Sequence, residues 1–242
     1  MAADKVTLYN GLRFLGSPWA YQIIGLEHIR PDHPAVFIAN HLANLGPIAV
    51  VISLPIRLHP WISAEMLDPL RAPGYLNQDF IGPTLHIHGV FGRTLANTLA
   101  KITVPMLTGL GCIPVERGAV LTASSFRRSL ELIRQGESLL IFPEDDFQPG
   151  DPQTGTRPFL GGFVQLCLLY KKHTGKSLPV YALAVHPPSQ TIVIDAACVF
   201  DQYIRRRDAL EDASAKMRQR IIELYLSQER GERVLQEGKS QD

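Results

Sequence analysis

The sequence predicts one α/β domain in which short apolar strands alternate with helices. The most distinct strands are predicted at residues 35–39, 58–63, 138–142, 178–185 and 191–194. Polar side chains directly follow several of these strands, and ligands of open α/β sheets bind at the carboxyl ends of strands. A chain of 242 residues, with 45% hydrophobic and 19% charged residues, is long enough for one such domain with a large core.

The composition excludes some partners and compartments. A net charge of +1 and a pI near 7.8 give no support for nucleic acid as a partner. The three cysteines (Cys112, Cys167 and Cys198) match neither a disulfide framework nor a metal site, so we expect reduced, intracellular thiols. The N-terminus lacks the order of a secretory signal, and no run approaches the roughly 20 apolar residues that span a bilayer. We therefore expect a cytoplasmic protein, and peripheral binding to the inner face of a membrane stays open.

Residues 1–30 are predicted to form an N-terminal amphipathic helical segment, and residues 31–242 a single α/β domain. Apolar and aromatic residues follow a roughly helical spacing in this segment, and Gly16-Ser17-Pro18 divides it into two short helical pieces. Such a face can pack into the core or insert into a lipid interface, as Trp and Tyr favour. Both alternatives stay open.

The first core strand ends at two polar residues, Asn40 and His41. A histidine at the carboxyl end of a strand is well placed for proton transfer, although a structural histidine is an equally simple interpretation. The sequence Gly46-Pro47 follows, and because proline is tolerated in the first turn of a helix, a helix is predicted to begin near Gly46.

Residues 73–93 are rich in Gly and Pro and are predicted to form a long surface loop. His86 and His88 within it would share a face if they lay on a strand. No Cys, Asp or Glu nearby completes a metal site at a convincing spacing, so we favour a pair of surface histidines.

Two further strand ends carry charged groups. A glycine turn and a short apolar strand lead to Arg117, whose guanidinium can match phosphate oxygens or simply be solvated. The strand at 138–142 ends on Glu144, Asp145 and Asp146. Helices are predicted at residues 122–135, at 161–170 and, as a charged helix docked on the domain, at 209–235.

The order of these groups resembles the glycerolipid acyltransferase family, which includes the lysophosphatidic-acid acyltransferases. That family has the blocks Asn-His-x4-Asp, Gly-x-x-Phe/Ile-x-x-Arg-Gly, Phe-Pro-Glu-Gly and a late Val/Ile-Pro-Val strand. The matching residues here are Asn40-His41, 111–118, Phe142-Pro143-Glu144 and 178–182. The resemblance covers residues 30–190 and implies a mixed, mostly parallel central sheet flanked by helices, as in the glycerol-3-phosphate acyltransferase fold.

The resemblance also implies a chemistry. His41 would be the general base that takes the proton from a glycerol hydroxyl as it attacks an acyl thioester. Arg117 would hold the phosphate of the acceptor, Gly118 would let the backbone approach it, and Asn40 and Glu144 would complete the substrate-binding set. The donor would be acyl-CoA or acyl carrier protein, and neither a cofactor nor a metal would be required.

The sequence departs from the family at two positions. The aspartate of the first block falls at Gly46, and the glycine of the third block is Asp145. In a serine protease, neutralising the carboxylate that orients the histidine costs about 10⁴ in kcat. Asp145 and Asp146 are candidate substitutes, because they follow a different strand and could reach across to His41. If Gly46 is a lost catalytic position, Gly46→Asp should raise activity; if Asp145 or Asp146 has taken over its role, the substitution should do little or harm the protein.

Two functions therefore stay open. The first is an acyltransferase acting on a lysophospholipid-type hydroxyl, and the second is a non-catalytic member of the same fold that binds lipid or an acyl carrier. Under either function, we expect peripheral membrane contact through residues 1–30. A serine hydrolase is set aside, because the chain has no Gly-x-Ser-x-Gly elbow.

Overall fold

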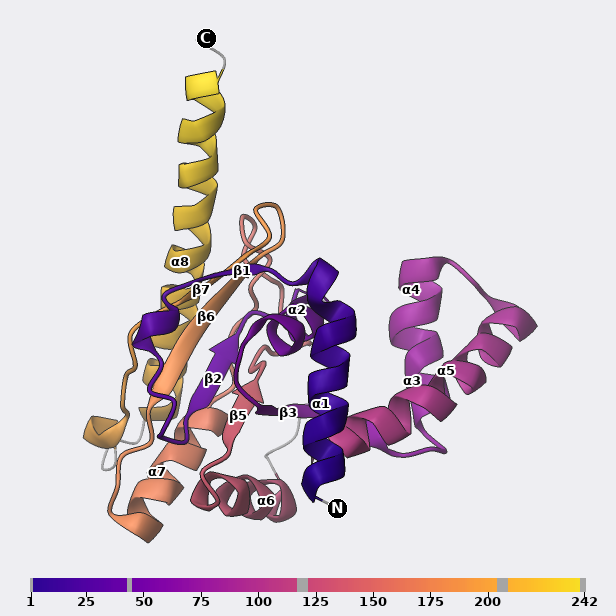
Figure 1. Cartoon of the computed structure of the whole chain (residues 1–242), viewed down its shortest axis with the longest axis horizontal. Coiled ribbons are helices and arrows are strands. Elements are labelled where there is room, and N and C mark those ends of the chain that lie inside the picture. The colour runs from indigo at the N-terminus through magenta and orange to yellow at the C-terminus, as the bar shows by residue number, and fades with distance from the viewer. Residues whose placement is uncertain (1, 43–44, 117–121, 204–208, 240–242) are drawn as a thin grey trace.

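A seven-stranded sheet forms the centre of the molecule in the computed structural model, which describes residues 2–42, 45–116, 122–203 and 209–239 (Figure 1). The strand order is β1-β7-β6-β2-β5-β3-β4. The strands are β1 (Gln22–Ile24), β2 (Val36–Ala39), β3 (Leu58–Ser63), β4 (Ile113–Val115), β5 (Ser138–Ile141), β6 (Val180–His186) and β7 (Thr191–Ile194). Every neighbouring pair is parallel except β6 and β7. The predicted mixed, mostly parallel sheet is confirmed.

Helices cover both faces of this sheet. One face is covered by α1 (Ala2–Gly16), α2 (Leu45–Ser53) and the last turns of α5 (Gly89–Leu110). The other is covered by α6 (Ala123–Arg134), α7 (Gly162–Thr174) and α8 (Ala209–Lys239). The short helices are η1 (Ser17–Trp19), η2 (Leu26–His28), η3 (Ala64–Leu67), α3 (Ala72–Leu76), the π-helical turn η4 (Asn77–Ile81), α4 (Gly82–Leu85) and η5 (Asp201–Tyr203).

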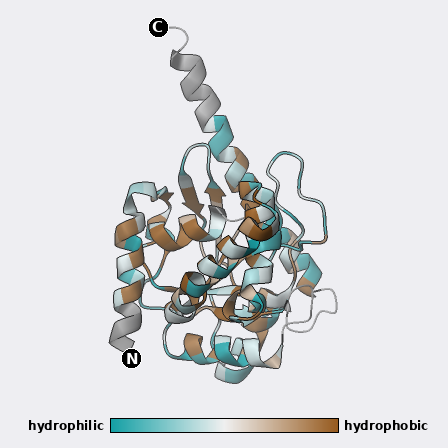
Figure 2. Cartoon of the chain, turned by 90° about the vertical axis from the view of Figure 1, so that its right-hand side faces the viewer, coloured by the Kyte–Doolittle hydropathy of each residue, from teal (hydrophilic) through white to brown (hydrophobic). Residues whose placement is uncertain are grey.

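The sequence of the central strand β2 is apolar without alternation because both faces of this strand are buried. Its side chains point alternately to the two faces, so Val36 and Ile38 join the core under α6–α8, while Phe37 joins the core under α1 and α2. Phe37 also stacks on Tyr181 of β6, with ring centroids 5.1 Å apart. Figure 2 shows the hydrophobic colour on strands of the sheet and on parts of the surrounding helices.

Residues 1–30 are helical over only part of their length. The helix α1 ends at Gly16 and η1 ends at Trp19, but Gln22–Ile24 is a strand that pairs with β7. The prediction of a second helical piece is therefore wrong, because pairing with a sheet edge outweighs the helical spacing. Tyr9 of α1 is buried, and its hydroxyl donates to the carbonyl of Ile56 at 2.9 Å. This segment packs on the body of the domain.

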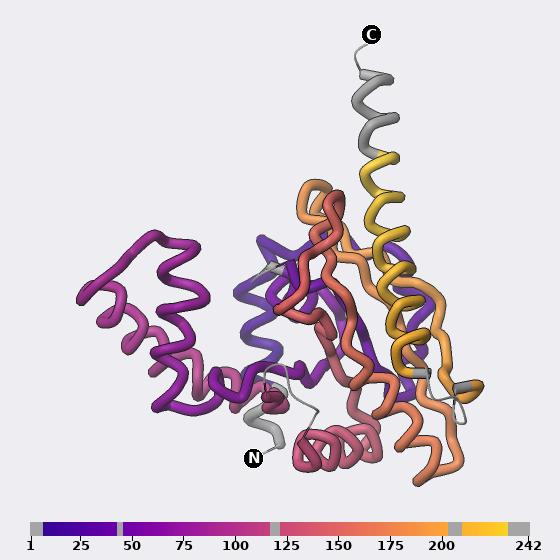
Figure 3. Tube along the Cα trace, turned by 180° about the vertical axis from the view of Figure 1, so that it is seen from behind, coloured from indigo at the N-terminus to yellow at the C-terminus, as the bar shows by residue number. Residues whose placement is uncertain are grey.

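The predicted long loop at residues 73–93 is also wrong. Residues 72–110 contain α3, η4, α4 and α5. Apart from the last turns of α5, these helices form an arm that stands off from the sheet with its own small apolar core (Figure 3). The prolines near the start of α3 and α4 are compatible with helix because they lie in a first turn. His86 is the C-cap residue of α4 and has a left-handed backbone conformation, and His88 is the N-cap residue of α5. Neither residue lies on a strand.

Other elements agree with their predictions. The strand predicted at 58–63 is β3, and the helix predicted at 122–135 is α6, whose N-cap Thr122 accepts a hydrogen bond from the backbone of Ser125. Among the described helices, none combines the length and the apolar character needed to cross a membrane.

Candidate active site

His41 lies at the carboxyl end of the central strand, two residues after β2 ends. Its side chain is half-buried, and its ring meets the ring of Phe142 edge to face with centroids 5.4 Å apart. Its carbonyl accepts a hydrogen bond from the backbone of Gly46 at 3.1 Å. The sheet and the start of α2 thus fix the backbone on both sides of this histidine.

Asn40 continues the sheet with its side chain. It is completely buried, its Nδ2 donates to the carbonyl of Val185 at 3.0 Å, and its Oδ1 accepts from the N–H of Val185 at 2.8 Å. The amide thus replaces a backbone pair just beyond the last β2–β6 pair, Ala39 with Leu183. Asn40, predicted to bind substrate, is placed inside the protein, where it fixes the start of the loop that carries His41.

Glu144 brings the first and third sequence blocks together. Its Oε1 accepts the backbone N–H of His41 at 2.8 Å, and its Oε2 accepts the backbone N–H of Arg157 at 3.3 Å. Because β2 and β5 are parallel neighbours, the residues that follow them meet at the same edge. Burial raises the pKa of Glu144 above its ordinary value, although the two N–H donors act in the opposite direction.

The two candidate substitute carboxylates lie in the loop after β5. Asp145 Oδ1 accepts the N–H of Phe147 at 3.0 Å, which closes a local turn. Asp146 is exposed, and its Oδ1 lies 2.7 Å from Nη1 of Arg157. These contacts tie both side chains to their own loop, and the suggestion that either one orients His41 stays a prediction.

The position of the missing aspartate cannot hold a side chain on this backbone. A Cβ atom at Gly46 would lie 2.4 Å from the carbonyl oxygen of His41 and 2.6 Å from that of Asn40. Real Cβ atoms do not approach backbone oxygens so closely, so any side chain would move the loop. Of the two outcomes predicted for Gly46→Asp, the close approach of these oxygens favours harm to the protein over a gain in activity.

Arg117 and Gly118, predicted to bind the phosphate of the acceptor, lie outside the described residues. The strand before them, β4, ends at Val115 and is the third strand from β2 across the sheet. At the usual strand spacing, about 14 Å separates the axes of β2 and β4. The roles of both residues stay predictions.

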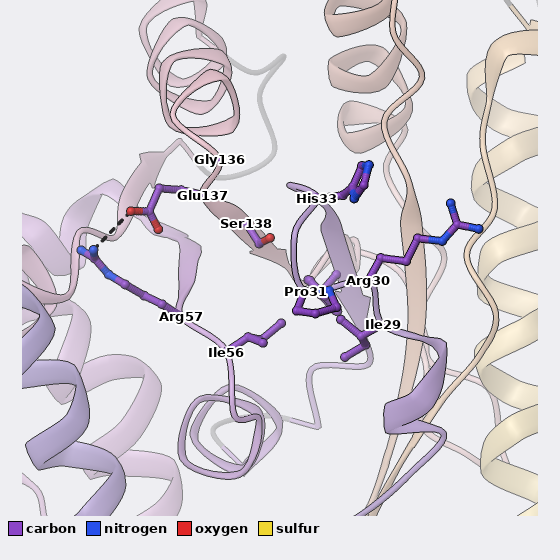
Figure 4. Close-up of a pocket in the computed structure, with 10 residues that line it drawn as sticks. Ile29, Arg30, Pro31, His33, Ile56, Arg57, Gly136, Glu137 and Ser138 are labelled. Atoms are coloured by element: carbon purple, nitrogen blue, oxygen red, sulfur yellow. Dashed lines mark hydrogen bonds and ion pairs between the residues drawn. The ribbon is translucent and has the colours of Figure 1, made fainter.

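A pocket of about 200 Å³ opens at the opposite edge of the sheet, near the start of β5 (Figure 4). An ion pair of 3.3 Å between Arg57 and Glu137 borders it, and Arg30 and His33 point away from that pair. His41 and Glu144 follow the carboxyl ends of their strands, so this pocket is not part of the candidate active site.

Sequence reasoning missed the partners of the predicted residues. Arg157 contributes its main-chain N–H, and Val185 contributes its N–H and its carbonyl; such roles do not depend on residue type and leave no motif. Phe142 belongs to the third sequence block, but no sequence pattern predicts its contact with the His41 ring. A tertiary structure was needed to find all three.

These elements form an α/β fold with a mixed, mostly parallel sheet flanked by helices. Neither a family model nor the sequence of a curated protein matches the chain. Among solved structures, the chain is similar to the 1-acyl-sn-glycerophosphate (LPA) acyltransferase PlsC from Thermotoga maritima, with a TM-score of 0.54 and 12% sequence identity. The match covers 91% of this chain and 80% of that one. At this identity the similarity establishes a shared fold.

Gly46→Ala should lower the free energy of unfolding by about 1–3 kcal/mol, because the added Cβ overlaps the His41 carbonyl oxygen. Gly11→Ala, in α1, is the matched control: its Cβ would meet nothing within 4 Å, so it should stabilise by about 0.4–1 kcal/mol. Urea unfolding measures both. A Gly46→Ala protein as stable as the wild type would show that the loop is loose at this position.

Glu144→Gln should reveal the titration of this carboxyl group. Because its pKa is raised in the folded protein, the native state holds the proton to a higher pH than the unfolded chain, where the pKa is about 4.3. The stability that this proton contributes is complete below the unfolded pKa and is lost as the pH rises through the native pKa.

The stability of the wild type, minus that of Glu144→Gln, should therefore fall as the pH rises from about 4 through this window. Urea unfolding at a series of pH values measures the difference. Asp146→Asn serves as the control, because Asp146 is exposed in the same loop. A difference for Glu144→Gln that is constant with pH would contradict the raised pKa of this carboxyl group.

Proposed function

We propose that the protein is an acyltransferase that moves a fatty acyl group from a thioester, acyl-CoA or acyl carrier protein, to the hydroxyl of a lysophospholipid-type acceptor. The fold shared with an LPA acyltransferase supports the reaction class. The observation that carries the proposal is the hydrogen bond between Glu144 and the backbone of His41, which unites two of the four sequence blocks at one sheet edge.

In the proposed reaction, the His41 imidazole takes the proton from the acceptor hydroxyl as its oxygen attacks the thioester carbonyl. The new C–O bond forms, the C–S bond breaks, and the imidazolium returns its proton to the leaving thiolate. Such proton transfer typically contributes about 10²- to 10⁴-fold to the rate. The reaction needs the two substrates alone, without a cofactor or a metal.

The remaining residues position these groups. Glu144 holds the N–H of the Asn40–His41 peptide and the side chain of Asn40 is held by Val185, so the imidazole projects from a fixed point beyond the end of β2. Arg117 is proposed to bind the acceptor phosphate, as its place in the second block implies. A charge-assisted contact of that kind orients the hydroxyl without taking part in bond formation.

Gly46 favours a second candidate, a non-catalytic protein of this fold that binds lipid or an acyl carrier. In a His-Asp pair the carboxylate fixes the tautomer of the ring and stabilises the imidazolium, and no side chain at Gly46 can do so. Among the described residues, the neighbouring carboxylate of Glu144 bonds to the backbone of His41.

His41→Ala should abolish acyl transfer measured with radiolabelled acyl-CoA, or acyl carrier protein, and a panel of lysophospholipids. The expected loss is at least about 10²-fold in kcat, since the general base is removed. His33→Ala is the matched control: His33 is exposed and borders the pocket at the opposite sheet edge, so its loss should leave the rate unchanged.

The same assay decides between the two candidates. Turnover that His41→Ala removes and His33→Ala preserves would exclude the binding protein. Retained binding of lysophospholipid or acyl carrier protein by the wild type, with no turnover from any donor, would exclude the enzyme.

We also propose that the N-terminal segment contacts a membrane surface peripherally. Phe14, Leu15 and Trp19 are 79%, 72% and 71% exposed, although α1 packs on the domain through its other face. Ile48, in the first turns of α2, is also exposed, and Gly16 packs closely on Ile52 of the same helix. Exposed apolar side chains thus lie at the end of α1, on η1 and on α2, the helix that follows His41.

Trp19 reports this contact directly. Its fluorescence should shift to shorter wavelength when anionic phospholipid vesicles are added, because the indole leaves water for the interface. Phe14→Ser should weaken vesicle flotation several-fold, whereas Val90→Ser, an exposed apolar residue on the distant arm, should not. Unchanged Trp19 emission with saturating vesicles would contradict the proposed membrane face.

A further inference from the structure

A residue of the last helix reaches the loop behind the candidate active site. Arg218 of α8 is partly buried and faces the stretch that follows β5. Its Nε donates to the carbonyl of Arg157 at 3.0 Å, and its Nη2 donates to the carbonyl of Thr156 at 2.8 Å. The planar guanidinium therefore grips two consecutive carbonyl groups, which a lysine could not do in the same geometry.

The peptide unit that joins Thr156 to Arg157 is held at both ends. Its carbonyl oxygen faces Arg218, and its N–H donates to Oε2 of Glu144 at 3.3 Å. In a trans peptide the N–H and the carbonyl point in opposite directions, so one plane spans the space between the guanidinium and the carboxylate. The peptide dipole is aligned with both charges, which strengthens each hydrogen bond.

The other oxygen of Glu144 completes the connection to His41. Oε1 accepts the N–H of His41 at 2.8 Å, so a continuous series of hydrogen bonds runs from α8 through the peptide and the carboxylate to the end of β2. The loop also has local ties, such as the ion pair of Arg157 with Asp146 and the backbone bond from Leu160 to Pro143. These local ties stay within residues 143–160, whereas Arg218 anchors that loop to another element.

We infer that Arg218 is a positioning residue for His41. It holds the 156–157 peptide so that its N–H fixes one oxygen of Glu144, and the other oxygen then fixes the backbone of His41. It touches neither substrate nor the reacting atoms. The structural part of this inference stands on hydrogen bonds alone, and its effect on catalysis rests on the proposed acyltransferase function.

Arg218→Met tests the structural part, because it keeps much of the length of the side chain and removes every donor. Hydrogen exchange read at single amides by NMR should become about tenfold faster or more at Arg157 and at His41, as expected for the loss of hydrogen bonds from a charged donor. Arg218→Lys, which keeps the charge but not the fork, should give an intermediate rate.

Arg220→Met is the matched control. Arg220 lies two positions further along α8, is exposed and forms an ion pair with Asp195, away from the loop. This variant should leave exchange at both amides within about twofold of the wild type. Equal exchange at His41 in folded Arg218→Met and wild type would overturn the inference. If the Met variant does not fold, unchanged exchange in Arg218→Lys would overturn it as well.

The catalytic part has its own readout. If the wild type turns over, Arg218→Met should lower kcat by about tenfold or more with little change in KM, measured well below the unfolding temperature, because the imidazole is misplaced while the binding groups remain. A change in KM alone would contradict the positioning role. If the wild type shows no turnover, the proposed function fails, and the exchange data still decide whether Arg218 holds His41.

Discussion

The candidate site depends on one carboxylate that holds two main-chain N–H groups. Glu144 accepts hydrogen bonds from His41 and from Arg157, and His41 lies 103 positions earlier in the sequence. The side chain is largely withdrawn from water, which raises its pKa and makes the loss of either donor costly. Whatever chemistry His41 performs, the place of its backbone is set by this contact.

Asn40 and Gly46 also constrain the backbone near His41. Asn40 is committed to the neighbouring strand through both ends of its amide, and Gly46 passes so close to the His41 carbonyl that no Cβ fits. This position therefore lacks a carboxylate, and its backbone also requires a glycine. Glu144, which follows the adjacent strand β5, binds the backbone N–H of His41.

Much of the fold could be predicted, because strands buried on both faces are continuous apolar runs and β2, β5 and β6 have that pattern. The meeting of His41 and Glu144 could be predicted as well, since parallel neighbours end at one edge. The helical arm could not, because a high content of Gly and Pro is typical of loops, and only the packing around Ile81 reveals helices.

The supporting contacts of the site were beyond prediction for a different reason. Arg157 acts through its backbone, so no residue type marks the role, and Arg218 lies in a helix whose mixed charges indicate a solvated surface. The structural role of Asn40 could not be predicted either, because a sequence motif cannot distinguish an asparagine that binds a ligand from one that pairs with a strand.

The hydrogen bonds around His41 join residues that are far apart in the chain. Asn40 and Val185 are 145 positions apart, and Arg157 and Arg218 are 61 apart. Contacts between residues so far apart in the sequence form only after long loops close, so they form more slowly than local helices. During synthesis, β2 and the histidine emerge well before β6 and α8. The geometry at His41 is therefore a property of the whole domain and cannot exist in a nascent chain that carries the motif alone.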